Sequence, residues 1–201
     1  TVTAANDAAA SLTMTGTGTN ALTAVVLGDN TGLASMNVNS TNGVMTITGT
    51  ISGAGDGQGT LNIKDDDANL AGDLVTVSGV VGGSSKKLVA INIGSATEAG
   101  NALFEAAVSA TTITVDGGNH ANETGLVEFR DAVTATTIAL DKNTADATAT
   151  FNATNGAKTV AGNINGINAG DGVIAVIDDD ADAAPDAITF SGTIGGTGVG
   201  T

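Results

Sequence analysis

The stretch Phe104-Glu-Ala-Ala-Val-Ser-Ala-Thr-Thr-Ile-Thr-Val-Asp116 returns further along the chain as Phe129-Arg-Asp-Ala-Val-Thr-Ala-Thr-Thr-Ile-Ala-Leu-Asp141. Apolar and polar residues alternate around Ile113 and Ile138, which is the period of a β-strand with one buried face. The strands of a β-sandwich need not resemble one another, whereas a solenoid is built from similar coils that stack. The echo therefore predicts an all-β chain folded as a parallel β-solenoid (β-helix), in which each such unit is one rung.

A longer repeat encloses this short one. Residues 22–83 align without a gap to residues 135–196, and 26 of the 62 aligned positions are identical. We expect a first super-repeat in residues 1–113, with about four rungs, and a second, incomplete one in residues 114–201. Together they predict one continuous solenoid of about six irregular rungs that presents the same lateral surface every four rungs or so. The alternative is a pair of tandem β-sandwich domains of about 113 residues each, since short strands with glycine-rich turns also fit that unit.

Apolar positions also suggest how the rungs align. Six residues are predicted to start equivalent rungs: Val25, Leu61, Ile91, Ile113, Ile138 and Ile174. A second apolar position follows each of them, at a short and a longer spacing in alternation: Val38, Val77, Phe104, Phe129, Phe151 and Phe190. Because this second set takes in all four phenylalanines, we expect a column of like side chains stacked from rung to rung through a common core.

Composition excludes several classes of partner and chemistry. Six basic residues against 21 acidic ones give a formal charge of −15, which repels nucleic acids and anionic lipids. No run of apolar residues is long enough to cross a bilayer, so we expect no direct membrane insertion in this segment. The chain has no cysteine and one histidine, His120, which rules out disulfides and leaves no pair of Cys or His side chains for a zinc site.

Clustered aspartates mark the best candidate site. Each super-repeat has one acidic turn, and the candidate metal ligands are Asp65, Asp66, Asp67 and Asp73 in the first, with Asp178, Asp179, Asp180 and Asp186 in the second. Calcium is the predicted ion, because it takes six to eight oxygen ligands and would relieve the repulsion between carboxylates. The spacing matches neither an EF-hand nor the nonapeptide of calcium-binding β-rolls. Solvated turns that only keep the chain soluble remain the alternative.

Catalytic residues are not predicted, and we expect a protein that is not an enzyme. A remote alternative is a calcium-dependent polysaccharide lyase, in which the only arginine, Arg130, would lie near the sugar. The chain has no Trp or Tyr to stack on a sugar face, and Arg130 aligns with Asn152 on the next rung. The pair Lys86-Lys87 is either a contact for an acidic surface or plain solubilising charge.

The chain resembles the repetitive passenger regions of bacterial surface-layer and autotransporter adhesins, such as rickettsial outer membrane protein B. Three segments carry the resemblance: Val75–Ser84, Phe104–Val115 and Ala149–Gly156. The resemblance implies an exported, extracellular β-solenoid of the bacterial cell surface with a coating, filament or adhesive role. It implies no catalytic residues. We therefore expect a structural protein that self-associates into a surface layer, filament or extracellular fibre, with an adhesin stalk that binds a host or bacterial surface as the alternative.

Overall fold

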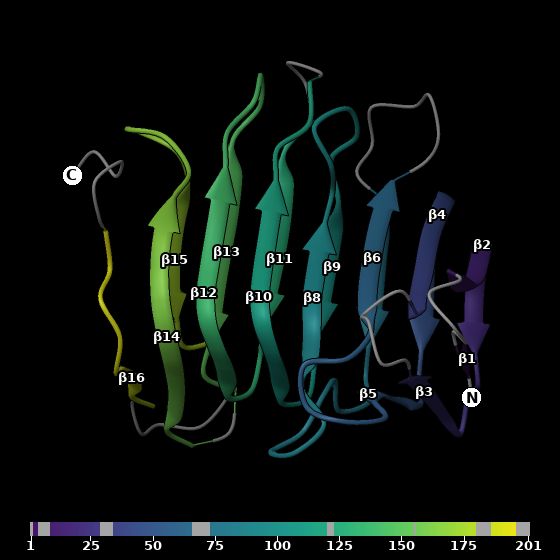
Figure 1. Cartoon of the computed structure of the whole chain (residues 1–201). Coiled ribbons are helices and arrows are strands. Elements are labelled where there is room, and N and C mark those ends of the chain that lie inside the picture. Colours follow the sequence, from purple (N-terminus) through teal and green to yellow (C-terminus); the bar gives the residue numbers. More distant parts are fainter. Residues whose placement is uncertain are drawn as a thin grey trace.

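The fold is a parallel β-solenoid of about six rungs, as the sequence predicts. The computed structural model describes residues 2–3, 9–28, 34–65, 73–119, 123–154, 156–179 and 186–195. These residues form sixteen strands and no helix (Figure 1), and every pair of neighbouring strands is parallel. Tandem β-sandwich domains do not describe this chain, because their sheets are antiparallel.

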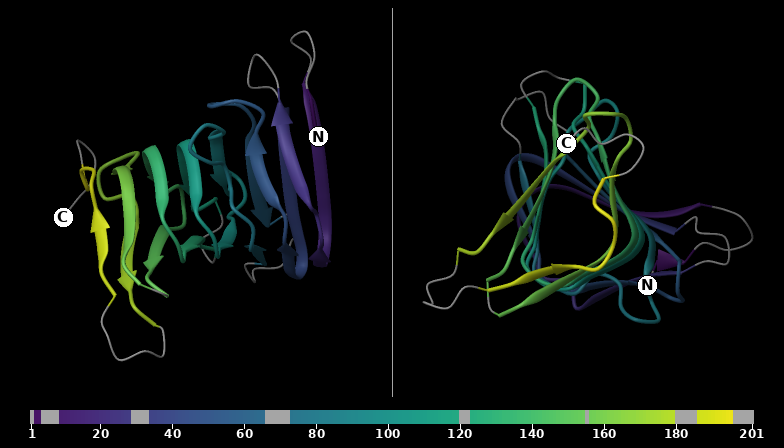
Figure 2. Two further views of the ribbon diagram at one scale, coloured as in Figure 1. Left: turned by 90° about the horizontal axis from the view of Figure 1, so that it is seen from below. Right: turned by 90° about the vertical axis from the view of Figure 1, so that its left-hand side faces the viewer.

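Each rung passes over three faces, and the view down the axis in Figure 2 has a triangular outline. The first face holds β1 (Val2–Thr3), β3 (Ala24–Gly28), β5 (Thr50–Gly53), β16 (Ile188–Phe190) and the starts of β10 (Val108–Asp116), β12 (Val133–Asp141) and β14 (Lys158–Gly166). The second face holds the starts of β2 (Ala10–Asn20) and β4 (Ala34–Ile47), then β6 (Thr60–Asp65), β8 (Leu88–Ile93) and the ends of β10, β12 and β14. The third face holds the ends of β2 and β4, then β7 (Leu74–Val77), β9 (Asn101–Phe104), β11 (Gly125–Phe129), β13 (Ala147–Asn152) and β15 (Val173–Ile177).

Glycines allow the corners of the triangle to stack. A Cβ atom added to Gly49 would lie 1.8 Å from the carbonyl oxygen of Leu22 on the rung below, and one added to Gly79 would lie 2.2 Å from the carbonyl oxygen of Gly49. Any side chain at these positions would therefore force neighbouring rungs apart. The same corner needs glycine on successive rungs.

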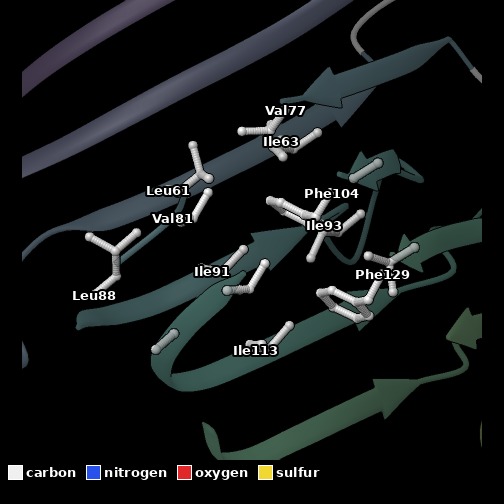
Figure 3. Close-up of a cluster of buried hydrophobic side chains, with 14 of the residues drawn as sticks. Leu61, Ile63, Val77, Val81, Leu88, Ile91, Ile93, Phe104, Ile113 and Phe129 are labelled. Carbon is white, nitrogen blue, oxygen red and sulfur yellow. The ribbon is translucent and has the colours of Figure 1, made fainter. Parts of the chain in front are cut away.

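Aliphatic side chains fill the interior, one above another. Leu61, Ile91, Ile113 and Ile138 face one another in register on the second face and are fully buried, as predicted (Figure 3 shows the first three). The column continues to Met36 and Ile164 rather than to Val25 and Ile174. Those two predicted rung starts lie on other faces, since Val25 pairs with Ile51 on the first face and Ile174 with Ala149 on the third.

The predicted phenylalanine column holds for its central members. Val77, Phe104, Phe129 and Phe151 are in register on the third face. The rings of Phe104 and Phe129 stack with centroids 5.5 Å apart, and so do those of Phe129 and Phe151.

The prediction is wrong for the two outer members of the set, Val38 and Phe190, because they are not in register with this column. Val38 pairs with Ile63 on the second face, and Phe190 pairs with Val160 on the first. Phe190 still meets the column, because its ring packs edge-on against Phe151 across the core, with centroids 5.3 Å apart. Spacing along the chain alone could not tell a stack along one face from a contact across the interior.

A second column, of amides, runs along the outside of the second face. The Nδ2 of Asn62 donates to the Oδ1 of Asn37, and the Nδ2 of Asn92 donates to the Oδ1 of Asn62, both at 2.8 Å. Such ladders tie identical side chains of adjacent parallel strands together. Successive rungs are therefore joined by side chains on the surface as well as in the core.

The super-repeat does not return to the same face. Residues 24–28 of β3, on the first face, correspond to residues 137–141 at the end of β12, on the second. The second-face strand β6 corresponds in the same way to β15 on the third face, and β7 on the third face corresponds to β16 on the first. One super-repeat therefore makes four complete rungs and then continues over one more of the three faces of the next rung.

Backbone contacts confirm that the two copies have one conformation. The amide of Ala54 donates to the carbonyl of Leu27 at 2.9 Å, and at the equivalent positions of the second copy Ile167 donates to Leu140 at 2.9 Å. Likewise Ile51 bridges to Val81, and Ile164 bridges to Ile194. The lateral surface therefore recurs after about four rungs, but on the next face of the solenoid. Equivalent surfaces are turned by one face, about 21 Å further along the axis at ~4.8 Å per rung.

Candidate functional site

The first acidic turn leaves the second face at the end of β6. Asp65 and Asp73 are both buried, with 5% and 7% of their surfaces exposed, and the Oδ2 of Asp65 accepts a hydrogen bond from the backbone amide of Asp73 at 3.1 Å. The Oδ2 of Asp73 is buried and has no hydrogen-bond partner among the described residues. A bound water or cation could satisfy that oxygen. The structure thus brings together two of the four predicted ligands of this turn.

The second acidic turn repeats this geometry in a more open place. The Oδ2 of Asp178 accepts from the amide of Asp186 at 3.0 Å, which reproduces the bond between the equivalent residues of the first turn. The Oδ2 of Asp186 also accepts from the amide of Gly156. Asp178 and Asp179 are exposed. Equivalent turns therefore have buried carboxylates at one corner of the solenoid and solvated ones at the next.

Part of the predicted set cannot be placed. Asp66, Asp67 and Asp180 lie outside the described residues, as does His120. Within the described ranges, no three Asp, Glu or His side chains lie close enough together to hold a metal ion. Calcium at these turns stays a prediction.

A third carboxylate group lies at the corner where the second face ends. Asp116 and Asp141 pair in register on adjacent rungs, and Asp171 follows in the next turn. Burial raises the pKa of Asp141 above its ordinary value, and the charges of Asp116 and then Asp171 raise it further. The short echo aligns Asp116 with Asp141 and so signals that contact. No sequence pattern brings in Asp171, because it belongs to a turn of different length.

Asp116 and Asp171, the two aspartates beside Asp141, accept hydrogen bonds from neutral donors. The Oδ1 of Asp116 accepts from the amide of Gly118 at 2.9 Å and from the Nδ2 of Asn143 at 2.7 Å. The Oδ2 of Asp171 accepts from the amide of Asn168 at 2.6 Å. These bonds fix the corner turns. Repulsion with Asp141 remains, and it opposes the stacking of these two rungs.

Arg130 lies in a polar network on the outside of the phenylalanine column. Its Nε donates to the Oε1 of Glu128 at 2.7 Å, and its Nη1 lies 4.0 Å from the Oε1 of Glu105. The hydrogen bond from Arg130 to Glu128 is the main reason that the pKa of Arg130 is raised. Asn152, on the next rung, donates to the same Glu128 oxygen at 2.9 Å. Arg130 thus joins its own rung to the rung below it, where Glu105 lies, which is a structural role.

None of the described residues forms a helix long and apolar enough to span a membrane. No protein-family model, no curated protein and no solved structure matches this chain. The geometry of the solenoid itself therefore carries the functional argument.

Proposed function

We propose that this chain is part of a structural, self-assembling protein of the bacterial cell surface, such as a surface layer, a filament or an extracellular fibre. The observation that carries the proposal is that side chains bond or stack from rung to rung along the axis, in the asparagine ladder and in the phenylalanine column. Such contacts add stability with every rung and support an elongated object. An active site needs instead a set of unlike groups that converge on one point.

The ends of the solenoid support extension. Among the described residues, β2 pairs only with β4 and β15 only with β13, so each has one open edge. Two side chains of β15, Val173 and Val176, are 47% and 55% exposed. Open parallel edges beside apolar side chains accept another strand. We propose that further rungs, or a second copy of this chain, cover them.

Localisation, chemistry and partners follow from the same proposal. A −15 charge, no cysteine and a stack of rungs suit an extracellular, non-catalytic protein whose partner is itself. Nucleic acid is not an expected partner. Calcium at the aspartate turns would be a stabilising ion, with the buried Oδ2 of Asp73 as its best-supported ligand.

Electron microscopy of the purified protein, with calcium and then with a chelator, tests the proposal. Ordered sheets or filaments that fall apart on chelation would support both self-assembly and bridging cations. Assemblies that ignore the chelator would keep the structural role and discard calcium. Dispersed short rods in both conditions would contradict self-assembly and favour the adhesin stalk, which binding to a bacterial or host glycan would then test.

A further inference from the structure

Lys86 and Lys87 are adjacent in the chain, and neither side chain pairs with a carboxylate among the described residues. Arg130, Lys142 and Lys158 each lie within 4.0 Å of a carboxylate of their own chain. No ion pair is formed by Lys64, Lys86 or Lys87 in the part of the chain that the structure describes, and of these three only Lys86 and Lys87 are adjacent. Their charges remain available to a partner.

The loop that carries these lysines is held firmly. The carbonyl of Lys86 accepts from the amide of Gly53 at 3.1 Å, and the carbonyl of Lys87 accepts from the amide of Gly57 at 2.9 Å. The amide of Lys87 donates to the Oδ1 of Asp56 at 3.2 Å. Because the backbone is already ordered, a contact at this loop costs less conformational entropy than one at a free loop.

Beside the loop, the first face is hollowed by a groove of about 350 Å³. Small apolar residues, Val80, Ala107 and Ala132, line it, with Ser84, Lys87 and Thr134 among its polar residues. Val80 is 40% exposed. We call this hollow, together with the exposed Lys86 that precedes Lys87 in the chain, the lysine groove. It suits a segment that combines small apolar side chains with negative charge.

The turn between β15 and β16 has that chemistry. Its sequence, Asp178-Asp-Asp-Ala-Asp-Ala-Ala-Pro-Asp186, combines five aspartates with three alanines and one proline. Asp178 and Asp179 are exposed, whereas Asp65 and Asp73 of the equivalent first turn are buried. Two copies of a −15 chain repel each other in most orientations. An orientation that brings this turn to the unpaired lysines gains local attraction.

We propose that the lysine groove binds the Asp178–Asp186 turn of a second copy of this chain, and this inference rests on the proposed self-assembly. The groove lies on the first face, whereas Asp178 and Asp179 follow β15 of the third face and Asp186 precedes β16, so the contact is heterologous. A heterologous contact that does not close into a ring generates an open polymer. Electrostatic complementarity sets its orientation and makes it sensitive to salt.

Charge reversal tests the contact directly. We expect K86E/K87E and D178K/D179K each to weaken self-association at low ionic strength by at least about tenfold, as sedimentation velocity would measure. An equimolar mixture of the two variants should associate again, because the reversed groove then meets the reversed turn. K142E is the matched control, since Lys142 lies away from the groove and already pairs with Asp146 at 2.6 Å. It should leave association unchanged.

A labelled peptide of residues 177–187 separates this contact from assembly. Fluorescence anisotropy should show that it binds the wild-type chain and not K86E/K87E. If the wild type assembles but neither reversal weakens assembly, or the mixture fails to restore it, the groove contact is wrong and the structural role stands. If the peptide binds while the wild type stays monomeric, the groove recognises this sequence, but the contact between two copies and the proposed self-assembly are both wrong. If the wild type stays monomeric and the peptide does not bind, the groove contact and the proposed self-assembly are both wrong.

Discussion

Leu27 packs against Gly59, and Leu140, on a different face of the solenoid, packs in the same way against Gly172. A Cβ atom added to Gly59 would lie 2.4 Å from the Cβ of Leu27, and one added to Gly172 would lie 2.4 Å from the Cβ of Leu140. Both glycines have positive φ, +79° and +84°. The two copies of the super-repeat thus keep a detailed packing relationship, although the second copy is turned by one face. The local sequence determines the conformation of the turn at each of these glycines. The number of residues in the intervening rungs determines the face of the solenoid on which that turn lies.

Replacing Gly59 by alanine should destabilise the chain by about 3 kcal/mol. The left-handed backbone contributes about 1 kcal/mol of this and the overlap with Leu27 the remainder. Gly57→Ala is the control, because its φ is +72° but no atom lies within 4 Å of the added Cβ, so we expect about 1 kcal/mol. Urea unfolding would measure both. Equal losses would show that the contact with Leu27 contributes nothing.

Truncating the middle ring of the aromatic column should cost more than truncating its end. Phe129→Ala removes a fully packed ring that stacks on both Phe104 and Phe151, and we expect a loss of about 4 kcal/mol. Phe190→Ala removes a half-buried ring with one edge-on contact, and we expect about half that loss. The shift in urea midpoint would compare them. A larger effect at Phe190 would mean that the last rungs, and not the column, limit stability.

The carboxyl of Asp141 should make stability depend on pH. Its pKa in the folded chain is raised above 3.8 by burial and by Asp116 and Asp171. The folded state then binds the proton more tightly than the unfolded chain, so this group stabilises the fold as pH falls from the raised pKa toward 3.8. At neutral pH, D141N should unfold at a higher temperature than the wild type, because the amide carries no charge for burial and the two neighbouring aspartates to disfavour.

The difference between D141N and the wild type should shrink as pH falls through that window. Calorimetry at a series of pH values would measure it, with D179N as the control for loss of an exposed carboxylate. A constant difference at every pH would show that Asp141 does not titrate differently in the folded chain.

The turn of one face per super-repeat can be measured with spin labels, because the chain has no cysteine of its own. Ala24 and Ala132 lie on the first face four rungs apart, so labels at A24C and A132C should be separated by about 19 Å along the axis. The repeat-equivalent pair, A24C with T137C, places its second label on the next face and should give a longer distance. If the A24C/T137C distance were the shorter one, the repeats would stack face on face and our assignment of rungs would be wrong.

Much of the fold was predictable from the sequence. The echo of Phe104–Asp116 in Phe129–Asp141 sets these two rungs in register, because equal lengths of chain between like residues return the backbone to the same height and face. Where rungs differ in length the prediction fails, as at Val25, Ile174, Val38 and Phe190. A turn can absorb extra residues without moving the strand that follows, so counting along the chain loses track of the face.

The candidate site was less predictable. Sequence clustering identified both acidic turns, and the pairing of Asp65 with Asp73 repeats as that of Asp178 with Asp186. Their burial could not be read from two similar turns, because it depends on which corner of the solenoid each turn occupies and on what the adjacent rungs place there. The short echo predicts the pairing of Asp116 with Asp141, but the approach of Asp171, the network around Arg130 and the lysine groove emerge only in the tertiary structure.

The sequence by itself determined the parallel solenoid, the alternation that buries one side of each strand, and the existence of two equivalent repeats, because these depend on short-range periodicity and on similarity between segments. The tertiary structure alone decided that the repeats are turned by one face, that Phe190 meets Phe151 across the core, and that Lys86 and Lys87 lie beside an apolar groove. These relationships depend on the summed length of all intervening rungs and turns, which closes around the axis only when the whole chain is folded.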